Sequence, residues 1–388
     1  IGIARQISQI ETQAQRRVGL VVKGQRSHPA TVHIRLLRSL TNLPGHDVRV
    51  VDPAWLLAGG MHHLDVVVIQ RDAVPAALVE PLVAQLRAQG VPFVYEIDDL
   101  LWQLPEEHTD HNIDAAQQEA IQALMRAATV VTTSTPNLAK VIGAYNDQVV
   151  VMPNALDAAL WLQPLDSTRL ETLRKQHRLS PERPRILYMG TRSHATDLAL
   201  IAEAVEEVVR AQPEIDIIQI GGGTPLPHAR MLTPPKECSN YPEFVGWFRH
   251  IAATATMALA PLEDTPFNQA KSDIKTLDYG LAHVPAVFSR AGPYRSAVEH
   301  GKTGLLCDNE TGAWVQAIRQ MMASDTLRSD IESASFKRAC DRSYTVAVRQ
   351  EWGQLFQAAL NPFVRDDLSK LPLVRATTSE KIAEQEAA

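Results

Sequence analysis

Lys271, Ser272 and Asp278 have the spacing of a phosphate and ribose site. Lys271 and Ser272 fall where a loop is expected to turn into a helix within the segment 267–282. Free backbone N–H groups, the positive end of a helix dipole, an ammonium and a hydroxyl then converge on one point. Lys275 and Asp278 follow Lys271 at i+4 and i+7, on one helical face, so the carboxylate lies about two turns from the phosphate end. This pattern predicts a nucleoside diphosphate site, and a solvated stripe on an amphipathic helix is the alternative.

A second turn with the composition of a phosphate-binding loop lies at residues 190–197. Gly190 and Thr191 follow an apolar run at 185–189 and precede a helix expected over 198–211. Small residues let a ligand approach the backbone, and the start of the helix points N–H groups at it. Gly222, within a run of three glycines, leaves room for a bulky ligand. The alternatives are an ordinary helix cap at 190–197 and an ordinary glycine loop at 221–223.

The elements that must position these turns form an alternating α/β pattern. Apolar runs of four to six residues between helical segments imply parallel sheets covered on both faces, with ligands at the carboxyl ends of the strands. Strands are expected at 17–23, 47–51, 64–70, 91–97, 129–133 and 148–152, and in the second half at 185–189, 215–220, 257–261 and 283–289. Helices are expected near 32–40, 76–89, 114–127, 135–144, 198–211, 316–339 and 344–360.

A chain of 388 residues suits two such domains. We assign a first Rossmann-like domain to 18–155, a linker to 156–184, a second Rossmann-like domain to 185–340, a terminal helix to 341–365 and a polar tail to 366–388. Residues 1–17 carry a helical apolar stripe, which is either a connector to an upstream domain or an ordinary capping helix.

Composition excludes several classes of protein. The 38 Lys and Arg against 44 Asp and Glu give a net charge of −6, which argues against a general nucleic-acid binder. Residues 1–50 carry eight basic and two acidic side chains, whereas 96–119 carry eight acidic and no basic ones, so opposite potentials are expected in the first domain. The three cysteines show no C-x-x-C spacing, which is typical of a reducing cytosol. No apolar run is long enough to span a membrane, although peripheral association stays open.

The segment from Phe267 through Pro285, together with Pro293-Tyr294 and 301–306, resembles the donor half of a GT-B glycosyltransferase of the retaining family 4 type, glycosyl transferases group 1. The similarity is greatest to a branch with a Lys-Ser-x-x-Lys-x-x-acid-Tyr pattern, found in bacterial surface-polysaccharide enzymes. Better-known members carry an E-x7-E pair in this region. Aligned on Pro285, the second acid is Asp278 and the first position is Ala270.

The resemblance implies an α/β GT-B fold, in which two facing Rossmann-like domains with parallel sheets are joined by a terminal helix that crosses back to the first domain. It implies transfer of a sugar, with retention, from a nucleotide-diphosphate sugar on the second domain to a glycan or lipid-linked glycan acceptor on the first, in the cytoplasm or at the inner face of its membrane. No metal and no cofactor are expected, and with Ala270 in place of the first acid the leaving phosphate takes the acceptor's proton. The implied roles are catalytic for Lys271, Arg192 and Asp98; donor binding for Gly190, Thr191, His194, Gly222, Val245, Ser272, Lys275 and Asp278; and acceptor binding for Arg26, His28 and Asp99.

Three alternatives stay open. The basic residues of the first loop, Arg26, His28 and Arg35, are also explained as plain surface charges. Asp98 and Asp99, at the end of a strand, suit a metal, acceptor hydroxyls or the cap of the following turn. A GT-B-fold epimerase of nucleotide sugars and a non-catalytic glycan- or nucleotide-binding module are the other functions considered.

Overall fold

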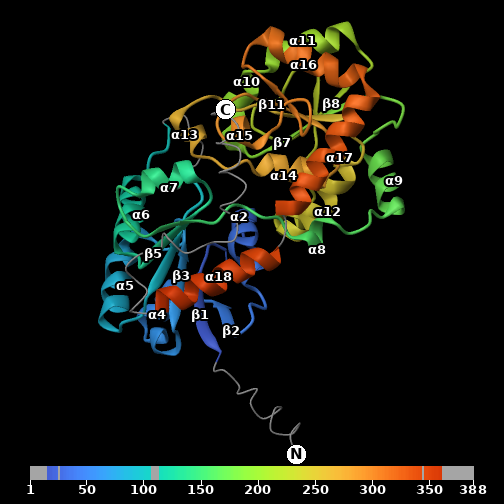
Figure 1. Ribbon diagram of the computed structural model, residues 1–388. Helices are drawn as coiled ribbons and strands as arrows, with labels where there is room; N and C mark the ends of the chain where they lie inside the picture. Colours follow the sequence, from blue (N-terminus) through green and yellow to red (C-terminus); the bar gives the residue numbers. More distant parts are fainter. Residues whose placement is uncertain (1–14, 25–26, 106–112, 343–344, 361–388) are drawn as a thin grey trace, which may run out of the picture.

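The computed structural model describes residues 15–24, 27–105, 113–342 and 345–360. The predicted helix over 1–17 and the polar tail 366–388 therefore fall largely or wholly outside the described residues. Figure 1 shows two α/β domains, one above the other, each built around its own sheet. Both sheets have six strands, and every strand pair in them is parallel.

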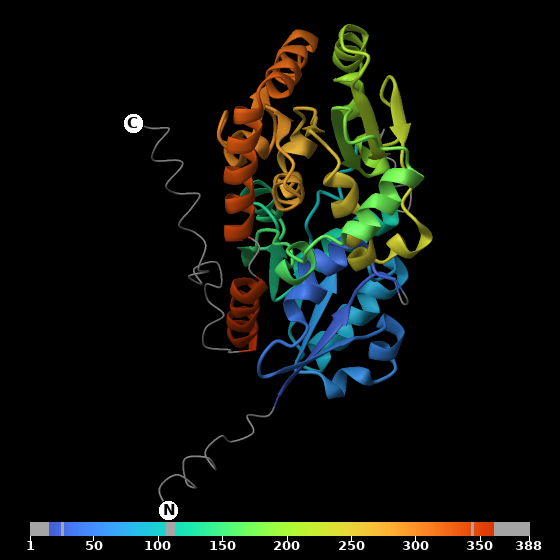
Figure 2. The same cartoon turned by 90° about the vertical axis from the view of Figure 1, so that its right-hand side faces the viewer.

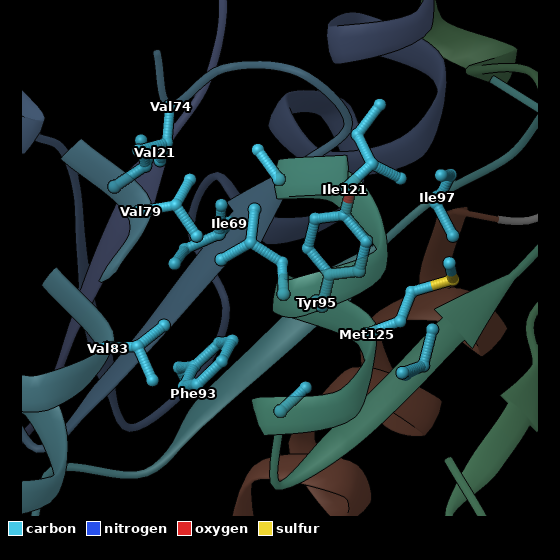
Figure 3. Close-up of a cluster of buried hydrophobic side chains, with 14 of the residues drawn as sticks. Val21, Ile69, Val74, Val79, Val83, Phe93, Tyr95, Ile97, Ile121 and Met125 are labelled. Carbon is cyan, nitrogen blue, oxygen red and sulfur yellow. The ribbon is translucent and has the colours of Figure 1, made fainter. Parts of the chain in front are cut away.

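The first sheet has the strand order β2-β1-β3-β4-β5-β6. Its strands are β1 (Arg16–Val21), β2 (His46–Val50), β3 (Val66–Gln70), β4 (Phe93–Glu96), β5 (Val130–Thr133) and β6 (Val149–Val151). The order reverses between β1 and β3, so the loops after these two strands diverge at the carboxyl edge of the sheet, which is where doubly wound sheets bind ligands. Figure 3 shows apolar side chains on one face of this sheet, where Tyr95 lies between Ile69 and Met125.

The second sheet has the order β12-β11-β10-β7-β8-β9, with its reversal between β7 and β10. Its strands are β7 (Arg185–Gly190), β8 (Asp216–Gly221), β9 (Ala229–Met231), β10 (Met257–Ala260), β11 (Ala286–Ser289) and β12 (Leu305–Cys307). Strands β9 and β12 were not predicted, because each has only three residues and β9 contains Arg230.

Helices cover both faces of each sheet. In the first domain they are α2 (Ala30–Val32), α3 (Arg38–Leu40), α4 (Pro53–Leu57), α5 (Ala76–Ala88), α6 (Ala115–Ala127) and α7 (Pro136–Ile142), with the linker helices α8 (Ala158–Trp161) and α9 (Ser167–Gln176). In the second domain they are α10 (Ala195–Ala199), α11 (Ala202–Ala211), α12 (Tyr241–Ala252), α13 (Pro266–Gln269), α14 (Ile274–Leu281), α15 (Tyr294–Ala297), α16 (Thr311–Ala323) and α17 (Asp325–Arg342). Short 3-10 turns occur at Gly60–His63, Arg192–His194 and Lys236–Ser239.

The predicted helix over 32–40 is interrupted in the structure. A single wide π-helical turn, η1 (His33–Leu37), separates α2 from α3. Such turns are frequent at functional sites, because the extra residue re-aims the side chains that follow it. Here the turn carries His33 and Arg35, both buried at the edge of the first sheet nearest the second domain.

The terminal helix α18 (Thr345–Leu360) crosses back to the first domain, as predicted from the resemblance. Its buried residues Trp352, Leu355 and Phe356 share one apolar cluster with Val18 and Leu20 of β1. Figures 1 and 2 show the helix, in red, lying against the first domain below α17. The predicted α/β GT-B fold is therefore confirmed.

Candidate active site

The two loops at the chain reversal of the second sheet are joined through one buried carboxylate. Asp197 follows β7 and accepts a hydrogen bond from the backbone N–H of Glu263, which follows β10, at 2.7 Å. The same oxygen lies 3.4 Å from the Asn268 amide nitrogen. Its other oxygen lies 2.6 Å from Nδ1 of His194. Asp197 therefore brings together the turn 190–197 and the loop that begins at Glu263 and leads into the predicted segment 267–282, at one edge of the sheet.

Lys271 and Ser272 lie in the bend between α13 and α14, and the helix itself begins later than predicted, at Ile274. Lys271 consequently does not share the helical face of Lys275 and Asp278. Its charge still lowers the pKa values of both Lys275 and His194. The Lys271 ammonium is half-buried, 5.0 Å from the centroid of the Phe267 ring.

Lys275 and Asp278 are buried, which excludes the alternative of a solvated stripe. Lys275 donates a hydrogen bond to the Met189 carbonyl and lies 5.3 Å from the centroid of the Tyr188 ring. Burial lowers the pKa of Lys275 to about 8, although Asp278 and Asp197 attract its charge. Burial likewise raises the pKa of Asp278 to about 7, and the ammonium of Lys275 offsets part of that rise. A buried cation and a buried anion with displaced pKa values thus lie three residues apart on α14, as at many ligand sites.

His194 is a neutral imidazole in this environment. Burial lowers its pKa to about 4, and the neighbouring charges of Lys275 and Lys271 act in the same direction, against the hydrogen bond to Asp197. With Nδ1–H directed at the carboxylate of Asp197, the other ring nitrogen becomes an acceptor. Thr191 and Arg192 lie on the same turn and are exposed, so the Arg192 guanidinium is accessible to a ligand.

The Tyr188 side chain leaves no room for a Cβ atom at Gly190 or Gly222. A Cβ at Gly190 would lie 2.4 Å from the Tyr188 hydroxyl oxygen, and one at Gly222, whose φ is +82°, would lie 2.6 Å from Cε1 of the same ring. The sequence explained both glycines by the approach of a ligand. In the structure their close partner is this aromatic ring, over which Lys275 lies.

The local structure predicted around Val245 is wrong. The segment 243–247 was expected to expose its backbone to a nucleobase, but it forms the interior of α12, and Val245 is fully buried in the core of the domain. Its N–H lies inside the helix, where it belongs to the i to i−4 ladder. The apolar spacing Tyr241, Val245, Phe248 and Ala252, with Pro242 at the helix start, was the missed signal for a helix.

In the first domain, Asp98 has both carboxylate oxygens engaged. Arg71 donates to Oδ1 and the Thr31 hydroxyl donates to Oδ2, each at 2.6 Å. Burial alone would raise the pKa of Asp98, but the charges of Arg71 and Arg35 and the hydrogen bonds from Thr31 and Arg71 together outweigh burial and hold the pKa below its usual value. Asp98 therefore anchors the loops after β1 and β3, and its catalytic role stays a prediction.

The three predicted acceptor-binding residues have separate outcomes. Asp99 accepts a hydrogen bond from the Leu100 N–H at 3.0 Å, so it caps its own turn. Nδ1 of His28 lies 2.8 Å from the Lys23 carbonyl oxygen, and its ring is half-buried. Arg26 lies outside the described residues. Within the part of the chain that the structure describes, no three His, Cys, Asp or Glu side chains are grouped as metal ligands, and no helix is long and apolar enough to cross a membrane.

Comparisons with known proteins agree with this geometry. The family model for glycosyl transferases group 1 matches residues 183–324, which carry both site loops. The D-inositol 3-phosphate glycosyltransferase of Pseudarthrobacter chlorophenolicus is 23% identical over 300 residues, a match that covers 69% of this chain and 68% of that protein. The chain is a glycosyltransferase with the GT-B fold.

Solved structures share the fold across nearly the whole glycosyltransferase. Anabaena HepE in complex with UDP and glucose has a TM-score of 0.62 at 14% identity, and the match covers 89% of this chain and 100% of that one. Sucrose-phosphate synthase from Thermosynechococcus elongatus has a TM-score of 0.64 at 14% identity, covering 88% and 98%. The family model and the relative support the transferase class and the use of a nucleotide sugar.

Ala270, which occupies the position of the first family acid, is buried in the apolar cluster of the first domain together with Phe267. Its carbonyl accepts a hydrogen bond from the Thr135 hydroxyl at 2.9 Å, and the neighbouring Gln269 carbonyl accepts one from Asn137 at 2.9 Å. A carboxylate at position 270 would lose its hydration among these apolar groups. Ala270 therefore contributes to the packing between the two domains.

Sequence reasoning missed several contacts between distant parts of the chain. Arg71 adopts a left-handed backbone with φ of 50°, which no sequence signal indicated. Its carbonyl accepts a hydrogen bond from the Tyr95 hydroxyl at 2.8 Å. His33 of the first domain stacks on Tyr241 of the second, with ring centroids 5.5 Å apart. Both contacts join segments far apart in the chain, which a single sequence does not reveal.

Proposed function

We propose that this glycosyltransferase transfers a sugar with retention of anomeric configuration to a glycan or lipid-linked glycan, in the synthesis of a bacterial cell-surface polysaccharide of the O-antigen or capsule type. The reaction would take place in the cytoplasm or at the inner face of the membrane. The Lys-Ser-x-x-Lys-x-x-acid-Tyr pattern from Lys271 to Tyr279 supports the choice of acceptor class, because it resembles the branch with that role.

The observation that carries the donor site is the convergence of Lys271, Lys275 and neutral His194 at the reversal point of the second sheet, with Asp278 buried one turn behind. Two ammonium groups suit a diphosphate. The carboxylate suits ribose hydroxyls, and the acceptor nitrogen of His194 suits a hydroxyl of the donor sugar. The start of α14 adds backbone N–H groups directed at the phosphates.

The chemistry of the step follows from where charge develops. As the bond between the anomeric carbon and the diphosphate breaks, negative charge grows on the leaving phosphate. Lys271 and Arg192 then stabilise the transition state more than the ground state. A buried, uncharged Ala270 supplies no base, so the leaving phosphate oxygen takes the proton of the attacking acceptor hydroxyl. The acceptor would lie against the loops after β1 and β3, near His28 and Arg71.

A screen of UDP, GDP, dTDP and CMP sugars by thermal shift tests this function. We expect one nucleotide class to raise the melting temperature, because a ligand at 100 times its Kd stabilises the native state by about 2.7 kcal/mol. Product analysis with the selected sugar should then show the free nucleotide, a nucleoside diphosphate for a UDP, GDP or dTDP sugar, only when a glycan acceptor is added. Formation of an isomeric nucleotide sugar without acceptor would instead identify an epimerase, and no stabilisation by any of these sugars would contradict the donor site.

The proposed step needs no metal, because the cations of the protein face the diphosphate. We expect the rate of transfer to stay unchanged in a chelator such as EDTA. The matched measurement adds Mg²⁺ or Mn²⁺ after the chelator. A rate that is lost and then restored by the added ion would contradict the proposal and return attention to the carboxylates of Asp98 and Asp99.

A further inference from the structure

A chain of buried hydrogen bonds runs along the carboxyl edge of the first sheet. Glu96, at the end of β4, is fully buried and accepts from Arg35 Nε at 2.7 Å and from Gln70 Nε2 at 2.8 Å. Burial raises the pKa of Glu96, and the Arg35 charge offsets part of that rise. Because each oxygen of Glu96 accepts from a fixed donor, the carboxylate holds the guanidinium of Arg35 in one orientation.

Arg35 in turn fixes the orientation of the side-chain amide of Asn154, which is also buried. Its Nη1 donates to the Met152 carbonyl and to Oδ1 of Asn154, the latter at 2.9 Å. A guanidinium has donors only, so the oxygen of the Asn154 amide must face Arg35 and the NH₂ group must face the other way. In that direction lies the hydroxyl oxygen of Ser272, 2.8 Å from Nδ2.

These contacts determine where the hydroxyl hydrogen of Ser272 points. Its oxygen accepts from Asn154, so the hydroxyl hydrogen is free to point away from Asn154 as a donor. The alternative, a hydroxyl that donates to the amide, is excluded because Arg35 fixes the amide oxygen on the far side. Ser272 directly follows Lys271 and precedes α14 by two residues, at the proposed diphosphate position.

We propose that Arg35 and Asn154 are positioning residues that make Ser272 a hydrogen-bond donor to the diphosphate, and that they do so only while the two domains are in contact. This inference rests on the proposed function, which places the diphosphate at Ser272. Arg35 and Asn154 belong to the first domain and Ser272 to the second, so the hydrogen bond from Asn154 crosses the interface. Separation of the domains breaks it, which links donor binding to domain contact.

A double-mutant cycle tests the proposal. The probe is whichever of UDP, GDP, dTDP and CDP binds the wild type most tightly, and the measurement is its Kd by titration calorimetry. We expect Ser272→Ala and Asn154→Ala each to weaken binding by about tenfold, the size of one hydrogen bond to a charged group. The double variant should be no weaker than either single one, since Asn154 acts through Ser272.

Asn137→Ala is the matched control. Like Asn154, Asn137 donates from its side-chain amide across the interface to the same loop, at 2.9 Å, but to the carbonyl of Gln269. If Asn154 acts through Ser272 and not through general docking of the loop, Asn137→Ala leaves the Kd within twofold.

Three results are decisive. An additive double variant, about a hundredfold weaker than the wild type, overturns the proposal, as does a loss in Asn137→Ala equal to that in Asn154→Ala. If no nucleoside diphosphate binds the wild type, the proposed function itself fails. Should Asn154→Ala fail to fold, Asn154→Asp takes its place in the cycle. It keeps an oxygen for Arg35 and removes the donor to Ser272, so a loss that disappears on the Ser272→Ala background supports the same assignment.

Discussion

The two sheets of this glycosyltransferase differ at their reversal points, because the charges at these two points are in opposite states. At the reversal point of the first sheet the charges are paired within the protein: Lys23 with Asp72, Arg71 with Asp98 and Arg35 with Glu96. At the reversal point of the second sheet, none of Lys271, Lys275 and Arg192 forms a salt bridge with a described residue. The pKa values of Lys275 and Asp278 at this point are displaced toward each other.

This difference indicates that the charges at the first reversal point stabilise the fold, whereas those at the second are available to bind a ligand. Paired, hydrogen-bonded charges hold loops in place and offer little to a small charged ligand, whereas buried ions without a close partner gain when a ligand of opposite charge arrives. Substitutions at the first reversal point should therefore act mainly on stability. Substitutions at the second should act mainly on nucleotide binding and turnover.

The largest effect is expected on stability from Arg35→Met. Removal of the guanidinium leaves the carboxylate of Glu96 buried without its counter-charge, a loss of about 3–5 kcal/mol in the free energy of unfolding. Urea denaturation measures it. The control is Arg192→Met at the second reversal point, where the side chain is exposed and a change below about 0.5 kcal/mol is expected. Equal losses in the two variants would remove the distinction between the regions.

The next largest effect is expected on turnover from Lys271→Ala. An ammonium placed at developing phosphate charge contributes about 2–4 kcal/mol, so kcat/KM should fall by roughly two to three orders of magnitude while the melting temperature is kept. Lys23→Ala removes a lysine that is already paired with Asp72, and transfer should stay within about threefold. Activity of Lys271→Ala within a fewfold of wild type would contradict its assignment.

The sequence predicted the fold and the donor loop because both depend on local signals. Apolar periodicity gave most strands, and the Lys-Ser-x-x-Lys-x-x-acid-Tyr pattern located the loop that the structure brings to the reversal point. The two hydrogen bonds of Asp98 could not be predicted, because its partners, Thr31 and Arg71, lie 67 and 27 residues away in the chain. Asn154 was missed as a partner of Ser272 for the same reason, with 118 residues between them. Long-range pairing of polar groups leaves no periodic trace in one sequence.

A smaller effect is expected on nucleotide affinity from Asp278→Asn. A carboxylate that accepts from two ribose hydroxyls contributes about 1.5–3 kcal/mol, so binding should weaken by about one to two orders of magnitude, with KM changed more than kcat. A 2′-deoxyribose donor should bind the wild type less well than the ribose donor does. On Asp278→Asn that penalty should largely vanish. An undiminished penalty would show that Asp278 does not contact the ribose.

The smallest effect is the pH dependence of donor binding, which follows from the same pair of buried ions. The pKa of Asp278 is raised to about 7, so as pH falls through 7 the carboxylate takes up a proton and loses one acceptor position for the ribose. The pKa of Lys275 is lowered to about 8, so as pH rises through 8 the ammonium loses the charge that attracts the diphosphate. Affinity for a nucleotide sugar should therefore be greatest between about pH 7 and 8 and fall by up to about tenfold for each unit below that window.

The sugar nucleotide is the suitable probe, because its esterified diphosphate does not titrate in this range. Asp278→Asn should remove the acidic limb and leave the alkaline one, whereas Lys275→Met should do the reverse. An acidic limb that persists in Asp278→Asn would assign the titration to another group, and the second reversal point would then lack the displaced carboxylate that distinguishes it from the first.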